Sequence, residues 1–161
     1  MKLTSRFGCI VYRTLCVFMG VIMLWAGAAK LLHLKDFLNH LGEFTFMRGS
    51  GMEVAVAVSV IACELLLAHR LLGANPGRCD WLLSITLLVV FACYQIVIAQ
   101  QVGWLNSPEH ICPCFAASGQ SPPAPQIFYV LRALVLMALS GLGLWLSLKR
   151  DSDMESSAAT G

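Results

Sequence analysis

Hydrophobic positions along the chain form four long runs, separated by shorter polar segments. The runs cover residues 12–34, 54–72, 81–102 and 127–148. A helix that crosses a bilayer needs about 20 apolar residues, and each run has about that length. None of the runs alternates between apolar and polar positions, as a half-buried strand would. Because a segment in lipid must satisfy its own backbone hydrogen bonds, the pattern predicts an all-α membrane protein with a bundle of four transmembrane helices.

Composition also indicates an integral membrane protein. Of the 161 residues, 58% are hydrophobic and only 12% are charged, and the mean hydropathy is +0.74. Soluble domains carry about 25% charged residues. The net charge of +2 is too small to suggest nucleic-acid binding, and the sequence has no phosphate-binding glycine loop. We therefore expect one transmembrane domain over residues 1–150 and a disordered polar tail over residues 151–161.

Basic residues in the flanks of the runs predict the orientation, because Lys and Arg favour the cytoplasmic side. They gather before the first run, between the second and third, and after the fourth: Lys2, Arg6, Arg13, Arg70, Arg78, Lys149 and Arg150. The segment 103–126 has none, whereas the first loop has Lys35 and Arg48. We expect both termini in the cytoplasm, the chain in the inner (plasma) membrane, and segment 103–126 outside it. A cleaved signal peptide over residues 1–28 is the alternative, although its apolar stretch is long for one.

Two of the seven cysteines differ from the rest. Cys112 and Cys114 flank Pro113 in the predicted outer loop, whereas the others fall within the runs or on the predicted cytoplasmic side. A disulfide between two cysteines that are separated by a single residue would be strained, because the preferred separation and torsion are hard to reach in so short a segment. Strained disulfides exchange readily with thiols. We interpret the pair as a redox dithiol. A protonated His110 beside it would favour the reactive thiolate.

Two alternatives compete with a redox dithiol. A metal site would use Cys112, Cys114 and His110, but the sequence lacks the second half-site that structural zinc needs, so we predict no metal. A structural disulfide would need another cysteine on the outer side, and the predicted topology supplies none beyond the pair itself.

The ionisable residues furthest from the ends of the predicted spans are Lys30, Glu64 and Arg132. Charged side chains are expensive in lipid and usually mark a function. At a rise of about 1.5 Å per residue, Glu64 comes near the midplane and the two cations in the outer half of the membrane. We predict an intramembrane polar site beneath the outer loop, which could hold a quinone headgroup or exchange a proton. The alternative is an ion pair of Glu64 with Lys30 or Arg132 that only fixes helix packing.

Four short motifs have an order that resembles the MauE branch of the DoxX-like membrane proteins. They are Gly27-Ala-Ala-Lys30-Leu31, Glu64-Leu-Leu-Leu, Cys112-Pro-Cys114-Phe115 and Arg132. The resemblance implies a four-helix protein that acts with a thioredoxin-like protein in maturing the disulfide-rich small subunit of methylamine dehydrogenase. The chain departs from the family's usual pattern at Ile61, Pro113, Ala116 and Ala133, where Pro, Gly, Gly and Asn are common.

Residues and resemblance together favour a membrane component that exchanges disulfides with a periplasmic thioredoxin-like partner. Two other functions stay open. One is a non-enzymatic membrane anchor or assembly subunit, and the other is a quinone-linked subunit. A quinone is the only cofactor that the sequence brings into consideration.

Overall fold

The computed structural model describes residues 3–42, 51–73, 76–102 and 126–159. These residues form α1 (Leu3–Leu32), α2 (Leu34–Gly42), α3 (Met52–Leu72), α4 (Arg78–Val102) and α5 (Gln126–Ala159), with no strand within the described ranges. Four helices have segments long and apolar enough to cross a membrane: Gly8–Leu32, Met52–Leu72, Arg78–Val97 and Ile127–Arg150. The prediction of an all-helical protein with four such helices is confirmed.

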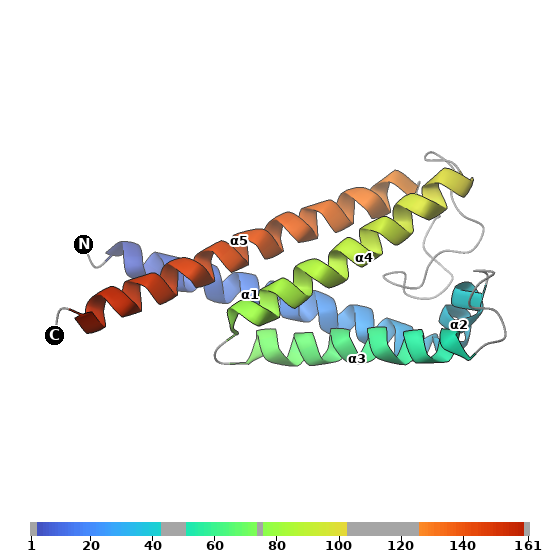
Figure 1. Ribbon diagram of the computed structural model, residues 1–161, viewed down its shortest axis with the longest axis horizontal. Coiled ribbons are helices and arrows are strands. Elements are labelled where there is room, and N and C mark those ends of the chain that lie inside the picture. The colour runs from blue at the N-terminus through green and yellow to red at the C-terminus, as the bar shows by residue number, and fades with distance from the viewer. Residues whose placement is uncertain (1–2, 43–50, 74–75, 103–125, 160–161) are drawn as a thin grey trace.

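The spanning helices form two pairs (Figure 1). In the first pair α1 packs along α3, and in the second α4 packs along α5. Contacts of α1 with α5 and of α3 with α4 join the two pairs. The start of α1, the end of α5 and the connection from α3 to α4 lie at one end of the bundle. The short helix α2, the end of α4 and the start of α5 lie at the other.

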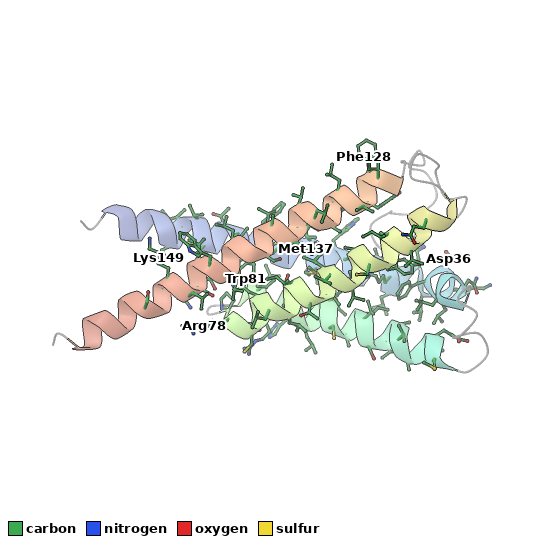
Figure 2. All side chains as sticks on the ribbon, turned by 45° about the horizontal axis from the view of Figure 1, so that its top comes forward. Asp36, Arg78, Trp81, Phe128, Met137 and Lys149 are labelled. Atoms are coloured by element: carbon green, nitrogen blue, oxygen red, sulfur yellow. The ribbon has the colours of Figure 1, made fainter. Side chains whose placement is uncertain are left out.

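Apolar side chains project outward from the bundle (Figure 2). Phe128 on α5, for example, has 58% of its surface exposed, and similar side chains lie along the other three spanning helices. Such a large apolar exterior is unfavourable in water. The exposed surface therefore indicates that the protein lies in a lipid bilayer.

The core that joins the two pairs lies towards the end with the α3–α4 connection. Its buried side chains come from all four spanning helices and include Tyr12, Met19, Met23, Leu67, Leu71, Trp81, Leu88 and Leu136. Small residues bring the helices close here. A Cβ added at Gly143 of α5 would lie 2.4 Å from the Trp81 ring, and one added at Gly20 of α1 would lie 2.8 Å from a leucine of α3. Glycines at helix interfaces allow such close approach.

A short helix follows the first span, where the sequence predicts only a polar connection. Phe37 and Leu41 of α2 are buried against Ala57 and Ile61 of α3. The nine residues of α2 hold too few apolar positions for helical periodicity to be recognised. Packing against α3 therefore determines this helix more than local pattern does.

The last helix also differs from the sequence prediction. The polar composition of residues 151–161 predicts a disordered tail, but α5 continues as a helix to Ala159. Helix propagation costs little once a helix has formed, because each added residue gains a backbone hydrogen bond. The spanning part of α5 provides that nucleus, so a polar continuation can remain helical.

Candidate functional site

Two of the predicted intramembrane residues meet in the structure. Lys30 lies in the last turn of α1 and Glu64 lies in α3. The Lys30 ammonium donates a hydrogen bond to the Glu64 carboxylate, and both side chains are fully buried. A single charge inside a membrane is costly, so each residue compensates the charge of the other.

Two aromatic rings lie over the Lys30 ammonium. Its Nζ atom is 4.8 Å from the ring centroid of Phe91 on α4 and 5.9 Å from that of Phe37 on α2. The electron-rich face of an aromatic ring attracts a cation, and the attraction is stronger where water is excluded. Side chains of three other helices, α2, α3 and α4, therefore surround this buried charge.

A glycine places the two charged residues within reach of each other. A Cβ added at Gly27, one turn before Lys30, would lie 3.4 Å from the Cβ of Glu64 and 2.9 Å from Leu65. The absence of a side chain at Gly27 lets α1 and α3 approach closely at this level. Because a Glu side chain is short, this approach allows its carboxylate to contact the ammonium of Lys30.

Arg132, the third predicted residue of the polar site, differs from this pair in its burial. It lies in the second turn of α5 and is exposed, whereas Lys30 and Glu64 are fully buried. Two cations at a similar depth can lie on differently oriented faces of their helices. The sequence gives the depth but not the rotation of α5.

The predicted redox residues Cys112, Cys114 and His110 lie outside the described residues. The helix ends on either side of them are Val102, which ends α4, and Gln126, which begins α5. Both ends lie at the end of the bundle that also carries α2 (Figure 1).

The five cysteines in the described part of the chain are free thiols, namely Cys9, Cys16, Cys63, Cys79 and Cys93. Cys16 is fully buried in the core, as expected of a cysteine that acts as a small apolar residue. Within the same ranges, no three His, Cys, Asp or Glu residues lie close enough to hold a metal ion.

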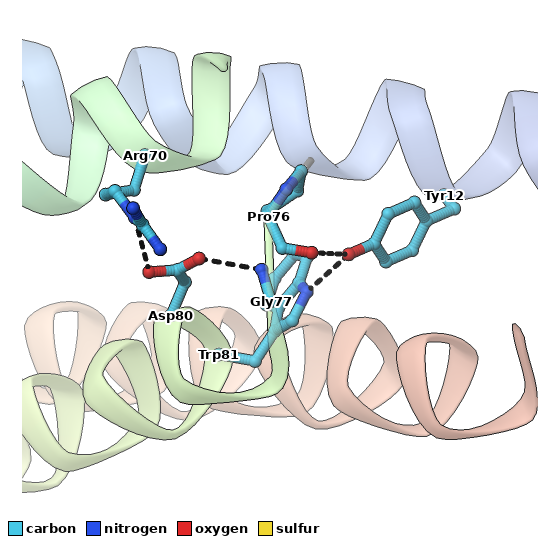
Figure 3. Close-up of polar contacts among 6 residues, drawn as sticks. All are labelled: Tyr12, Arg70, Pro76, Gly77, Asp80 and Trp81. Atoms are coloured by element: carbon cyan, nitrogen blue, oxygen red, sulfur yellow. Dashed lines mark hydrogen bonds and ion pairs between the residues drawn. The ribbon is translucent and has the colours of Figure 1, made fainter. Parts of the chain in front are cut away.

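A second polar cluster, at the other end of the bundle, was not predicted from the sequence (Figure 3). The Tyr12 hydroxyl of α1 donates a 2.9 Å hydrogen bond to the carbonyl of Pro76, and it accepts a 3.1 Å bond from the indole N–H of Trp81 on α4. Tyr12 and Trp81 thus connect the two helix pairs. Neither residue belongs to a motif, and only their positions near the ends of apolar runs could have suggested this interfacial role.

Asp80 secures the connection from α3 to α4. One carboxylate oxygen accepts a 2.7 Å hydrogen bond from the backbone N–H of Gly77, and the other accepts a 3.1 Å bond from Nε of Arg70. The carboxylate is placed in the first turn of α4, where the helix dipole favours a negative charge. This cluster holds the turn and shows no feature of a reactive centre.

A polar contact inside the spans joins α4 to α5. The hydroxyls of Ser84 and Ser140 are 3.0 Å apart and buried. Gln95 of α4 is also buried. In the sequence, Ser84 and Ser140 stand out only as polar residues within apolar runs. This pattern does not show which residue each of them contacts.

Comparison with known proteins completes this description. Neither the curated proteins nor the solved structures contain a match to this chain. The model of a family described as Methylamine utilisation protein MauE matches residues 8–146, a segment that includes the buried ion pair and the Cys112-Pro-Cys114 motif. The match covers most of the 161 residues, and the chain therefore belongs to the MauE family.

Proposed function

We propose that this MauE-family membrane protein is a thiol–disulfide redox component whose Cys112 and Cys114 exchange with a periplasmic thioredoxin-like partner. The observation that carries the proposal is the presence of this closely spaced pair within the family match. The five other cysteines are free thiols of the helices, and none of them has a second cysteine two residues away. Two neighbouring thiols are the minimum that a two-electron exchange requires.

The proposed exchange has two steps. A thiolate of the loop pair attacks the partner's disulfide, whose S–S bond breaks; a mixed disulfide forms and one partner sulfur leaves as a thiolate. The second loop cysteine then attacks the mixed disulfide and releases the other partner sulfur. The loop pair is oxidised by two electrons and the partner is reduced by two. The reverse exchange uses the same bonds, and the two reduction potentials set its direction.

The distribution of charge supports a periplasmic position for the cysteine pair. Four arginines lie near the connection from α3 to α4, at the end of the bundle where α1 begins, namely Arg13, Arg70, Arg78 and Arg150. Basic residues favour the cytoplasmic side of the inner membrane. The opposite end, where α4 ends and α5 begins, then faces the periplasm.

In this proposal the buried ion pair has a structural role. Lys30 lies over the ring of Phe37 on α2, and its contact with Glu64 fixes α1 against α3. The role that we assign to the pair is to hold α1 against α3 beside α4, the helix that precedes the redox segment. Its aromatic surroundings favour a second candidate function, a quinone-linked subunit, because Phe37 and Phe91 offer ring faces beside a buried cation. A quinone that copurifies with the wild type and is lost from Lys30→Met would support that candidate.

Trapping of a mixed disulfide tests the proposed exchange. Cys112→Ser and Cys114→Ser each remove one thiol, and the variant that keeps the attacking cysteine should accumulate a covalent adduct with a thioredoxin-like protein in membranes. The double variant should form none. Cys79→Ser is the matched control, since this exposed thiol lies at the opposite end of the bundle, and it should behave as the wild type.

A membrane anchor would give a different result. If the double variant binds its partner and supports maturation as well as the wild type does, the cysteines carry no chemistry and the anchor function replaces the redox proposal. Loss of maturation with partner binding retained would support the exchange.

A further inference from the structure

Each of the four spanning helices contributes one exposed arginine at the same end of the bundle. These residues, here called the arginine cluster, are Arg13 of α1, Arg70 of α3, Arg78 of α4 and Arg150 of α5. They belong to both helix pairs and surround the connection from α3 to α4. In the redox proposal they indicate only the orientation of the protein, and neither the thiol exchange nor the ion pair involves their side chains.

Three guanidinium groups of the cluster are held in place by contacts near the connection from α3 to α4. Arg13 donates to two backbone carbonyls at the end of α3, of which the one of Leu72 is 3.3 Å away. Arg70 donates to Asp80, and the guanidinium carbon of Arg150 lies 5.1 Å from the centroid of the Tyr12 ring. Side chains that are already ordered lose less conformational entropy when they bind a ligand.

The cluster lies at the level where the membrane-spanning segments end. The second segment ends at Leu72, the third begins at Arg78 and the fourth ends at Arg150. Lys149 adds a further cation, whose Nζ lies 5.5 Å from the ring centroid of the exposed Trp145. Tryptophan beside a basic residue is typical of the boundary between hydrocarbon and headgroups.

Acidic residues at this end do not cancel the cluster. Asp80 is buried and already accepts hydrogen bonds from Arg70 and from the backbone of Gly77. The acidic residues at positions 151, 153 and 155 follow Arg150 on the part of α5 that runs past the turn. At the level of the headgroups, the described side chains therefore present an excess of positive charge.

We propose that the arginine cluster binds the phosphate of an anionic phospholipid headgroup and that this lipid links the two helix pairs. A guanidinium matches phosphate oxygens with two parallel hydrogen bonds, and anionic lipid attracts basic residues near the surface. Arg13 and Arg70 belong to the first pair, while Arg78 and Arg150 belong to the second. A headgroup that contacts arginines of both pairs would resist their separation.

The lipid preference of the purified full chain tests this proposal. The protein is equilibrated in detergent with equal amounts of phosphatidylglycerol and phosphatidylcholine, and the lipids retained on the folded protein are counted by native mass spectrometry. We expect the wild type to retain phosphatidylglycerol selectively. Each arginine removed should lower that preference about fivefold, so Arg13→Gln/Arg150→Gln should lower it about 25-fold. The charge-keeping variant Arg13→Lys/Arg150→Lys should retain most of it.

Lys35→Gln is the matched control, because Lys35 is an exposed cation of α2 at the opposite end. It should keep the wild-type preference. Phosphatidylglycerol should also raise the melting temperature of the wild type more than phosphatidylcholine does, and free inorganic phosphate should not reproduce the rise. Equal retention of the two lipids by the wild type, an equal loss in Lys35→Gln, or full stabilisation by inorganic phosphate would each overturn the proposal. Reading the lipids on the folded species keeps the test valid if a variant is less stable.

Discussion

Replacement of Lys30 by Met should destabilise the protein much more than replacement of both members of the ion pair. The single change leaves the Glu64 carboxylate in a fully buried position without its ammonium partner. Removing one member of a buried pair costs about 3–5 kcal/mol. Loss of the contacts of the ammonium with Phe91 and Phe37 adds about 0.5–2 kcal/mol. We therefore expect Lys30→Met to lower the free energy of unfolding by about 4 kcal/mol or more.

The double variant Lys30→Met/Glu64→Leu removes both charges with little change in side-chain volume. No charge then remains at this buried position, and such replacements are often neutral or stabilising. We expect a change in the free energy of unfolding of less than about 1 kcal/mol. With Glu64→Leu alone costing about 3 kcal/mol, the two single changes together cost about 7 kcal/mol, so a double-mutant cycle should show a coupling energy of about 6 kcal/mol.

Reversible unfolding in mixed micelles of increasing sodium dodecyl sulfate content would measure these values. Arg132→Gln is a suitable control, because this residue is also a cation within a span but is exposed. It should change the free energy of unfolding much less than Lys30→Met does. Single-variant costs below about 1 kcal/mol, together with additive effects in the double variant, would contradict the role of the pair in joining α1 to α3.

Two further predictions concern the packing of the helices. Gly143→Ala places a Cβ 2.4 Å from the Trp81 ring and should lower stability by about 1–3 kcal/mol, whereas Gly141→Ala, with no atom within 4 Å, should be neutral or slightly stabilising. Equal melting temperatures of these two variants would show that the ring contact is wrong. Ser84→Ala should cost about 0.6–1.7 kcal/mol by breaking the hydrogen bond to Ser140, and the double alanine variant should cost less than the sum of the two single changes. Additive losses in the same unfolding assay would contradict the contact.

The number of spanning helices could be predicted from the sequence because lipid imposes a minimum apolar length on each of them. The depth of Lys30 and Glu64 could also be estimated, since the rise of a helix is regular. The structure places these two residues in contact, one of the two pairings of Glu64 that the sequence allows. Glu64 had a second candidate partner in Arg132, and depth alone did not distinguish between them.

Other features depend on helix rotation and on which helices are neighbours. A spanning helix has apolar residues both on the face towards lipid and on the face towards protein, so its sequence gives little indication of which face packs against the other helices. The contacts of Lys30 with Phe37 and Phe91 therefore could not be predicted, and neither could the bonds of Tyr12 with Pro76 and Trp81. These contacts arise where helices distant in the sequence pack together.

The redox midpoint of Cys112 and Cys114 in intact membranes is the measurement that tests the proposed function most directly. A variant in which the five described cysteines are replaced by Ala leaves only this pair, so every thiol signal reports on it. Differential alkylation with a membrane-impermeant maleimide across a series of glutathione potentials would give the midpoint. We expect labelling from the periplasmic side and a reversible two-electron transition between about −300 and −120 mV, the range of exchange-active dithiols. Thiols that stay reduced at every potential, or a bond that none of these potentials reduces, would contradict the proposed exchange.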